Sequence, residues 1–388
     1  MNRRSFLFSG FGFCGLCMAC TPNPAKRSLE GSGYKGRRLI IIELSGGNDG
    51  LNTLIPYRNE TYFTLRPTLA ISPNQTNKLT DQLGLHPNLK HFAKLYETGD
   101  LAVIQGLGYP SPSHSHFKST ALWHTGGDGN QRRNEGWIAK AAQVHCPNAA
   151  AHGISFSDDL GILSHKKGIF ISAHDTDQLR HMKLTTEIVG VHENPAISLI
   201  EKRLTSLKKS LTLLQKHLSD HAVSPDIDGR TLGRQLTEVV KVIQSDAPVP
   251  VFVTQLSGFD THEGQKYRHQ KKMRELDKSI GSTVAELKRS GHWERTLIMT
   301  TSEFGRRPLE NRSRGTDHGT AAPHFLIGGK IKGGIWGDVL DLASLDRNGD
   351  LKYSMDYRAV YDVVIKKWFH VNSRFADFRD PRLQNLIS

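Results

Sequence analysis

Short runs of apolar, mostly β-branched residues recur along the chain and predict the strands of a buried sheet. The first run is Leu39 to Leu44, and four similar runs lie at 101–107, 249–256, 296–301 and 324–328. Apolar residues at roughly helical spacing predict helices over 196–218 and 231–243. Strands that alternate with helices indicate an α/β fold, with three α/β/α layers around a mostly parallel central sheet.

We expect this pattern to form one domain over residues 39–388, with an insertion or cap around residues 135–183. A linker rich in Gly, Ser and basic residues precedes the domain over residues 20–38. A hydrophobic content of 37% is ordinary for a soluble globular protein of this length, so extensive disorder is not expected.

The first residues of the chain resemble an export signal. Arg3 and Arg4 stand just before Phe6 and Leu7, which is the arrangement read by the twin-arginine export machinery. The apolar run that follows ends at Ala19 and is shorter than the roughly 20 residues that span a bilayer. We therefore expect a signal peptide over residues 1–19 and a location in the periplasm or cell envelope.

Cysteine usage agrees with export. Cys14, Cys17 and Cys20 lie in or just after the apolar run, and only Cys146 remains in the body of the chain, so no disulfide framework is expected there. The Ala19-Cys20 step is a candidate lipoprotein processing site that would leave a lipid anchor on Cys20. Simple cleavage after Ala19 is the alternative.

The charge of the chain favours anionic partners. Its 51 Lys and Arg residues exceed its 38 Asp and Glu residues, which gives a formal net charge of +13. These basic residues are scattered, and no basic block interleaved with aromatic residues stands out, so nucleic-acid binding is not expected. An anionic ester substrate or an anionic lipid surface accounts for the charge equally well.

Potential metal ligands follow successive predicted strands. These candidates are Asp49, Asp260, His262, Glu303, Asp317 and His318. Each one alone is also typical of a turn or a helix cap. Because ligand sites lie beyond the carboxyl ends of parallel strands, the shared placement predicts a site for one or two divalent cations, Zn²⁺, Mn²⁺, Mg²⁺ or Ca²⁺. Two such ions would suit phosphoryl or sulfuryl transfer.

Four longer phrases carry a resemblance to a known family. They are SGGNDGLNTLIP, GLGYPSPSHSHFKS, SGFDTH and SEFGRRPLENRSRGTDHGTAAPHFLIGG. They are similar to the motifs of the DUF1501 family of exported bacterial proteins, which resembles the alkaline phosphatase and sulfatase superfamily in fold. The resemblance covers nearly all of the chain after the signal and implies an alkaline-phosphatase-like fold more firmly than it implies a reaction.

The resemblance also implies roles for individual ligands. Asp49 matches the first metal-binding aspartate, Asp260 and His262 resemble the next ligand pair, and His318 resembles the late histidine ligand, with Asp317 beside it. Glu303 stands where the superfamily shows Asp-His, and Phe304 replaces that histidine. One of the two metal positions therefore loses a ligand.

The superfamily nucleophile is a Ser or Thr at a helix N-terminus, and Ser115 is the candidate here. Ser113 and Ser119 are the alternative nucleophiles. We group His116, which follows Ser115 in the same helical pattern, with the catalytic residues. The alternative to a catalytic role is that Ser115 caps the helix and His116 packs nearby. Arg306 is expected either to bind the oxyanion of the substrate or to neutralise a carboxylate such as Glu310. The sequence C/S-x-P-x-R is missing, so a formylglycine sulfatase is not expected.

Three functions follow from these observations. The leading hypothesis is an exported, metal-dependent hydrolase of phosphate, phosphonate or sulfate esters. The second is a non-catalytic envelope protein for binding or assembly that keeps the fold with a degenerate metal site. The third is a surface protein that binds an anionic polymer through a basic face.

Overall fold

The computed structural model describes residues 34–130, 133–157, 159–184, 195–220 and 225–388. The expected signal peptide, the candidate lipid site at Cys20 and most of the expected linker lie outside these residues. In the part of the chain that is described, no helix combines the length and the apolar character needed to cross a membrane.

The central sheet is mixed and mostly parallel. Strands lie in the order β13-β5-β12-β9-β1-β8-β6-β7, and β14 pairs with β5. The strands are β1 (Arg38–Ser45), β5 (Leu101–Gly108), β6 (Gly153–Ser155), β7 (Phe170–Ser172), β8 (Val251–Ser257), β9 (Thr296–Thr301), β12 (Ala322–Ile327), β13 (Gly334–Trp336) and β14 (Met355–Asp356). Only β12 runs antiparallel to its neighbours β5 and β9. All five strands predicted from apolar runs are present.

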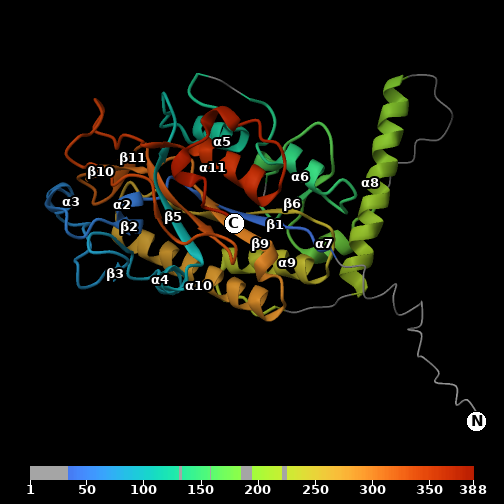
Figure 1. The fold of residues 1–388 in the computed structure, drawn as a ribbon, viewed down its shortest axis with the longest axis horizontal. Helices are drawn as coiled ribbons and strands as arrows, with labels where there is room; N and C mark the ends of the chain where they lie inside the picture. The colour runs from blue at the N-terminus through green and yellow to red at the C-terminus, as the bar shows by residue number, and fades with distance from the viewer. Residues whose placement is uncertain (1–33, 131–132, 158, 185–194, 221–224) are drawn as a thin grey trace, which may run out of the picture. The chain divides into compact units, whose positions relative to one another are not determined.

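Helices cover both faces of the sheet because alternate residues of each strand point to opposite sides. Ile40 and Ile42 of β1 join a core formed with α4 (Lys90–Glu97), α9 (Thr231–Gln244) and α10 (Gln265–Arg289). Leu39 and Ile41 join a second core formed with α5 (His116–Thr125), α6 (Ala139–His145) and α11 (Tyr357–Val363). Figure 1 shows these two helical layers on either side of β1 and β9. The predicted α/β/α fold is confirmed.

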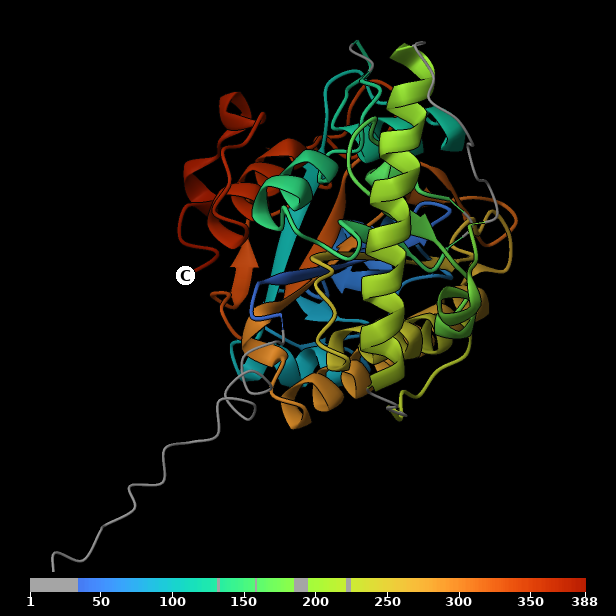
Figure 2. The same cartoon turned by 90° about the vertical axis from the view of Figure 1, so that its right-hand side faces the viewer.

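The segment expected as an insertion or cap contributes to the edge of the sheet. Within residues 135–183, β6 and β7 extend the sheet beyond β8, and α7 (Thr176–His181) follows them. The predicted helix over 196–218 is α8 (Pro195–Asp220), whose Leu211, Leu214 and Leu218 are buried. Figure 2 shows α8 in front of the sheet, and α7 is the element it contacts most.

Smaller elements surround the carboxyl edge of the sheet. The loop after β1 enters α2 (Gly50–Thr53) and then a three-stranded sheet of β2 (Leu54–Ile55), β4 (Gly84–Leu85) and β3 (Asn77–Lys78), with α3 (Glu60–Leu65) between β2 and β3. The loop after β9 leads into a hairpin of β10 (Arg306–Glu310) and β11 (Thr316–His318). In this hairpin Arg306 lies opposite His318, which brings both residues to the same loop edge.

A buried histidine in β12 should make the fold sensitive to acid. Burial lowers the pKa of His324 from 6.5 to about 4, while its Nδ1 bonds the Thr300 carbonyl at 3.2 Å. The unfolded chain therefore binds more protons than the folded chain between these two values, and stability falls as pH drops from 6.5 towards 4. Acidification from pH 6.5 towards pH 4 lowers the free energy of unfolding, and we expect this decrease to be smaller by up to about 3 kcal/mol in His324→Phe.

Urea unfolding of each protein at pH 7.5 and at pH 4.5 measures this effect as the difference between its two free energies of unfolding. This difference does not contain the pH-independent cost of the substitution. His174→Phe, at an exposed position, is the control and should keep the pH dependence of the wild type. An unchanged pH dependence in His324→Phe would contradict the expectation.

Candidate metal centre

Four loops meet at the carboxyl edge of the sheet. The strands β1, β8 and β9 are parallel, and β5 runs in the same direction because β12 is antiparallel to both β5 and β9. The loops that follow these four strands therefore emerge at one edge, as the sequence predicts. They carry Asp49, Asp260, Glu303 and His116, and the β10–β11 hairpin adds His318.

A carboxylate and imidazoles form the centre of this edge. One ligand atom each from His116, Asp260 and His318 lie within 4.8 Å of one another, which is compatible with a common metal ion. Asp260 Oδ1 lies 3.1 Å from His318 Nε2 and 3.1 Å from His262 Nε2, and Asp260 Oδ2 lies 3.4 Å from His116 Nε2. The structure therefore brings Asp260, His262 and His318 together and adds His116 to them.

The outer nitrogen of each imidazole faces a hydrogen-bond acceptor. His116 Nδ1 lies 2.8 Å from Glu303 Oε1, His262 Nδ1 lies 3.2 Å from Asp317 Oδ1, and His318 Nδ1 lies 2.7 Å from the His114 carbonyl oxygen. Acceptors at these positions place the hydrogen on Nδ1 of each neutral ring, so the lone pair of Nε2 points inward. Carboxylates and carbonyls hold metal-ligating histidines in the same way.

The donor set fits a divalent cation. His262 Nε2 and His318 Nε2 are only 2.9 Å apart, and two lone pairs at that distance repel each other unless a proton or a cation lies between them. His116 Nε2 is buried and makes no hydrogen bond, since its 3.4 Å approach to Asp260 does not qualify as one. The group of His116, Asp260 and His318 offers two imidazole nitrogens and a carboxylate, which are donors typical of Zn²⁺ and of similar transition-metal ions, and His262 Nε2 lies 3.1 Å from Asp260 Oδ1.

Arg306 holds the central carboxylate in place. Its fully buried guanidinium donates to Asp260 Oδ1 at 2.6 Å and to the backbone carbonyls of Gly47, Thr316, Phe259 and Gly46. Burial would raise the pKa of Asp260, but the hydrogen bond and the charge of Arg306 outweigh burial and lower this pKa to about 2. Of the two roles considered for Arg306, the contacts match neutralisation of a carboxylate, and that carboxylate is Asp260. Glu310 instead accepts from the backbone of Thr68 and Leu69.

Glu303 and Phe304 line the inner side of the centre. Besides His116, Glu303 Oε1 accepts the backbone N–H of Gly46 at 2.8 Å, so this predicted ligand serves an outer position in the structure. The hydrogen bond to Glu303 raises the pKa of His116. The buried ring of Phe304 lies 4.9 Å from the His116 ring and 4.7 Å from the His318 ring. An apolar ring thus occupies the place where the superfamily pattern shows a histidine.

Asp49 is not part of this group. Its carboxylate is fully buried and lies 2.6 Å from Arg66 Nη1, and Gln265 donates to the same Oδ2 atom. Burial would raise the pKa of Asp49, but the charge and hydrogen bond of Arg66 outweigh burial and lower it. The other oxygen, Oδ1, is buried without a partner. The predicted role of Asp49 as a ligand remains a prediction, and the pairing with Arg66 gives it a structural role.

The three candidate serines differ in their contacts. Ser115 is the N-cap of α5, is exposed, and makes no side-chain capping bond. Ser113 Oγ accepts the backbone N–H of Ser115 at 3.2 Å, while buried Ser119 donates to the Ser113 carbonyl at 2.7 Å. Of the three, only Ser115 has a hydroxyl without a hydrogen bond inside the described residues.

Several residues around the centre were missed by the sequence reasoning. His114 Nε2 lies 2.9 Å from Asp350 Oδ2, and Arg307 binds the other oxygen of that buried carboxylate. His269 of α10 is buried beside Asn48, and burial lowers the pKa of His269 to about 4. His114 stands in a quoted motif and was within reach of sequence reasoning. Asp350 and His269 lie in segments without a motif.

One family model matches part of the chain. Residues 237–353 match the model of a protein family of unknown function, DUF1501, and this region includes Asp260, His262 and His318. His116 lies outside the match. No curated protein matches the chain in sequence.

Several solved structures are similar to this chain at low sequence identity. An alkaline phosphatase superfamily protein from Vibrio parahaemolyticus is 10% identical with a TM-score of 0.33, over 78% of this chain and 62% of that one. The lipoteichoic acid synthase LtaP from Listeria monocytogenes is 9% identical with a TM-score of 0.39, over 78% and 68% of the two chains. Murine ectonucleotide pyrophosphatase/phosphodiesterase 5 is 9% identical with a TM-score of 0.41, over 91% and 100%.

Proposed function

We propose that this protein, which has an α/β/α fold and matches the DUF1501 family model over residues 237–353, binds a divalent cation and hydrolyses an anionic ester of phosphate, phosphonate or sulfate. The observation that carries the proposal is the arrangement of His116, His262 and His318 around Asp260, with every Nδ1 facing an acceptor and every Nε2 turned inward. A histidine cluster with a purely structural role does not need each of its three rings to have the hydrogen held on Nδ1 by its own acceptor. A metal centre requires this arrangement.

In this proposal each residue has a defined task. His116, Asp260, His262 and His318 hold the cation, which would polarise the ester oxygen and lower the pKa of a bound water or hydroxyl. Arg306 fixes Asp260 through an ion pair of 2.6 Å. Asp260 and His262 are each 45% exposed in their side chains, so an ester can reach the centre from solvent.

The nucleophile is either water or the hydroxyl of Ser115, which is free of other bonds. Ser115 precedes the first turn of α5, whose N-terminal N–H groups and helix dipole favour an anion. The excess of basic residues over acidic ones also favours an anionic substrate.

A second candidate is a binding or assembly protein that keeps the metal but performs no hydrolysis. The observation in its favour is that Asp49 is neutralised by Arg66, and that Phe304 occupies the place of a further histidine. Together these contacts leave ligands for one ion rather than for the pair that clamps both the attacking and the leaving oxygen.

Metal content decides whether the centre exists. We expect about one divalent ion per purified chain by plasma mass spectrometry, and loss of that ion in Asp260→Ala and His318→Ala, because each change removes a donor from the group. His181→Ala, an exposed histidine on α7, is the matched control and should keep the metal. A chain that binds none of Zn²⁺, Mn²⁺, Mg²⁺ or Ca²⁺ would overturn the proposal.

Activity then separates the two candidates. Aryl phosphates, phosphonates and sulfates are incubated with the metal-loaded protein, with EDTA, and with His318→Ala. Hydrolysis that depends on both the metal and His318 supports the hydrolase. Bound metal without hydrolysis of any of these esters favours the binding protein.

We further propose that the protein acts in the periplasm or cell envelope, on the basis of the Arg3-Arg4 motif, after passage through the twin-arginine machinery, with Cys20 as the candidate lipid anchor. Cell fractionation with Arg3→Lys and Arg4→Lys tests this. Equal export of wild type and double variant would contradict it.

A further inference from the structure

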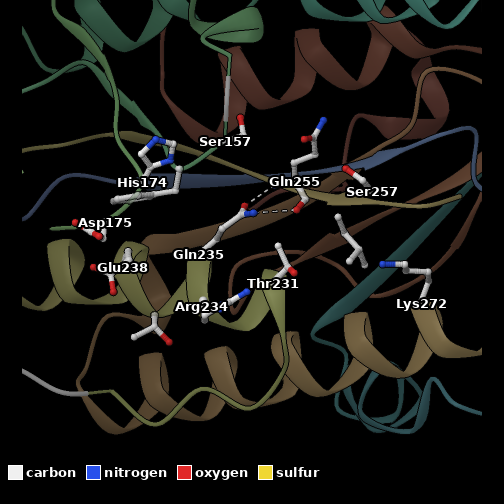
Figure 3. A pocket seen from close by; sticks show the side chains of 13 residues that line it. Ser157, His174, Asp175, Thr231, Arg234, Gln235, Glu238, Gln255, Ser257 and Lys272 are labelled. Carbon is white, nitrogen blue, oxygen red and sulfur yellow. Dashed lines mark hydrogen bonds between the residues drawn. The ribbon is translucent and has the colours of Figure 1, made fainter. Parts of the chain in front are cut away.

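A second cavity opens at the same edge of the sheet, on the other side of β8. It lies between β6, β8, α7 and α9 and has a volume of about 620 Å³, which is within the usual range for small-molecule sites. None of its lining residues belongs to the candidate metal centre. Figure 3 shows its side chains.

The cavity exists because β6 is shorter than β8. β6 pairs with β8 only at Phe252 and Val253, whereas β8 continues to Ser257. Beyond Val253 the open edge of β8 is satisfied by a side chain: Gln235 of α9 accepts the Gln255 N–H at 2.7 Å and donates to the Gln255 carbonyl at 3.2 Å. The side-chain amide of Gln235 makes the hydrogen bonds that a neighbouring strand would make. It is much smaller than a strand, so space remains beside it (Figure 3).

The acidic residues that line or border the cavity are already occupied. Glu238 accepts from the N–H and hydroxyl of Thr176 and pairs with Lys241 at 2.7 Å. Asp175 caps α7 by accepting the N–H of Gln178. Glu275, next to the cavity, caps α9. These carboxylates are engaged in holding helix termini.

The basic residues and two hydroxyls are not occupied in this way. Lys272 Nζ forms an ion pair with Glu275 Oε2 at 3.8 Å, a distance too long for a hydrogen bond. Within the described part of the chain, Arg234, Ser257 and Thr231 have no side-chain hydrogen bond or ion pair. In Figure 3 the ammonium of Lys272 extends towards the cavity, at the end opposite Asp175 and Glu238. Arg234, Ser257 and Thr231 are exposed to solvent, so these three side chains and the ammonium of Lys272 can donate hydrogen bonds to a ligand, and two of the four are cationic.

We propose that this cavity is an anion-binding site that takes the phosphate, sulfate or carboxylate group of a small ligand. Lys272 and Arg234 supply the charge, and the hydroxyls of Ser257 and Thr231 supply further hydrogen bonds. The site does not use the metal ligands, so the anion binds whether or not a cation is present. Because Ser257 is three residues before Asp260, their Cα atoms lie at most about 11 Å apart, and the two sites are neighbours along one loop.

Calorimetric titration of inorganic phosphate into the EDTA-treated full chain tests this proposal. We expect millimolar or tighter binding by the wild type and by His318→Ala, with at least about tenfold weaker binding in Lys272→Gln and in Arg234→Gln. Lys140→Gln, an exposed lysine on α6, is the control and should bind as the wild type does. Thermal unfolding of each variant shows that it is folded.

Three outcomes would overturn the proposal. One is a wild type that binds no phosphate, and another is equal binding in the double variant Lys272→Gln/Arg234→Gln, which would mean a non-specific surface effect. The third is loss of binding in His318→Ala, which would place the anion at the histidine cluster. Survival of binding in His318→Ala keeps this inference separate from the fate of the proposed hydrolase.

Discussion

Replacing Arg306 with Met is expected to lower the free energy of unfolding by about 3–5 kcal/mol, because the change removes a buried cation and leaves several acceptors without a donor. Arg306 is fully buried and bonds four backbone carbonyls from the loops after β1, β8 and β9, as well as Asp260. Those bonds tie together the loops that carry the candidate ligands, so we also expect metal affinity to fall by about 10–100-fold.

Chemical denaturation, or the thermal midpoint where unfolding is irreversible, measures the first effect, and metal titration measures the second. Arg312→Met, at an exposed position between β10 and β11, is the control, and its expected cost is within about 0.5 kcal/mol. Arg306→Lys keeps the positive charge but loses the several N–H donors of the guanidinium, so its loss in the free energy of unfolding should lie between those of Arg306→Met and the control. Wild-type stability in Arg306→Met would show that these bonds are not needed.

The strands of the sheet could be predicted because they are buried on both faces. The run at 39–44 corresponds to β1, whose alternate residues enter the two separate cores, so the run is apolar except for Glu43, which pairs with His124. In α10 the opposite holds. This helix is rich in Lys and Arg, and the apolar residues of its buried face, such as Met273, Leu276 and Ile280, alternate with buried polar and acidic residues. The apolar residues have helical spacing and could have predicted this helix, but the many charged residues between them make the spacing hard to recognise.

The edge that carries the centre could be predicted, but the inner and outer positions of its residues could not. Acidic and histidine residues after parallel strands had to meet, and Asp260, His262 and His318 do. His116, grouped with the nucleophile in the sequence analysis, lies among the ligands, and Glu303 lies behind it. Both placements depend on the position of α5 at the edge of the sheet and on which nitrogen of the His116 ring faces inward. Residue spacing in the sequence predicts neither of these two features.

The partner of Asp49 was beyond prediction for a different reason. Arg66 follows α3 in an irregular segment with no pattern of its own, and its Nε and Nη2 atoms bond the backbone carbonyls of Pro308 and Arg307 at 2.8 and 2.9 Å. The hairpin after β9 therefore holds Arg66 against the loop after β1. Three segments distant in sequence must meet before this ion pair exists.

This pair gives the last prediction, which separates a structural from a ligating Asp49. Arg66→Met is expected to cost about 3–5 kcal/mol of stability, because it leaves a buried, unpaired carboxylate. Asp49→Asn in the same background should recover part of that loss, since it removes the orphaned charge, and the double-mutant cycle should give a coupling of about 1–3 kcal/mol. Urea denaturation of the four proteins measures the cycle.

Metal content of Asp49→Asn completes the argument. If Asp49 serves only to neutralise Arg66, this variant keeps its ion while losing stability, whereas Asp260→Ala loses the ion. An Asp49→Asn chain that is stable but free of metal, together with additive costs in the cycle, would instead make Asp49 a ligand and restore the two-ion centre that the sequence pattern suggested. The cation would then have to displace Arg66 from Oδ2 or use the partnerless Oδ1, and both routes would weaken the ion pair whose strength the cycle records.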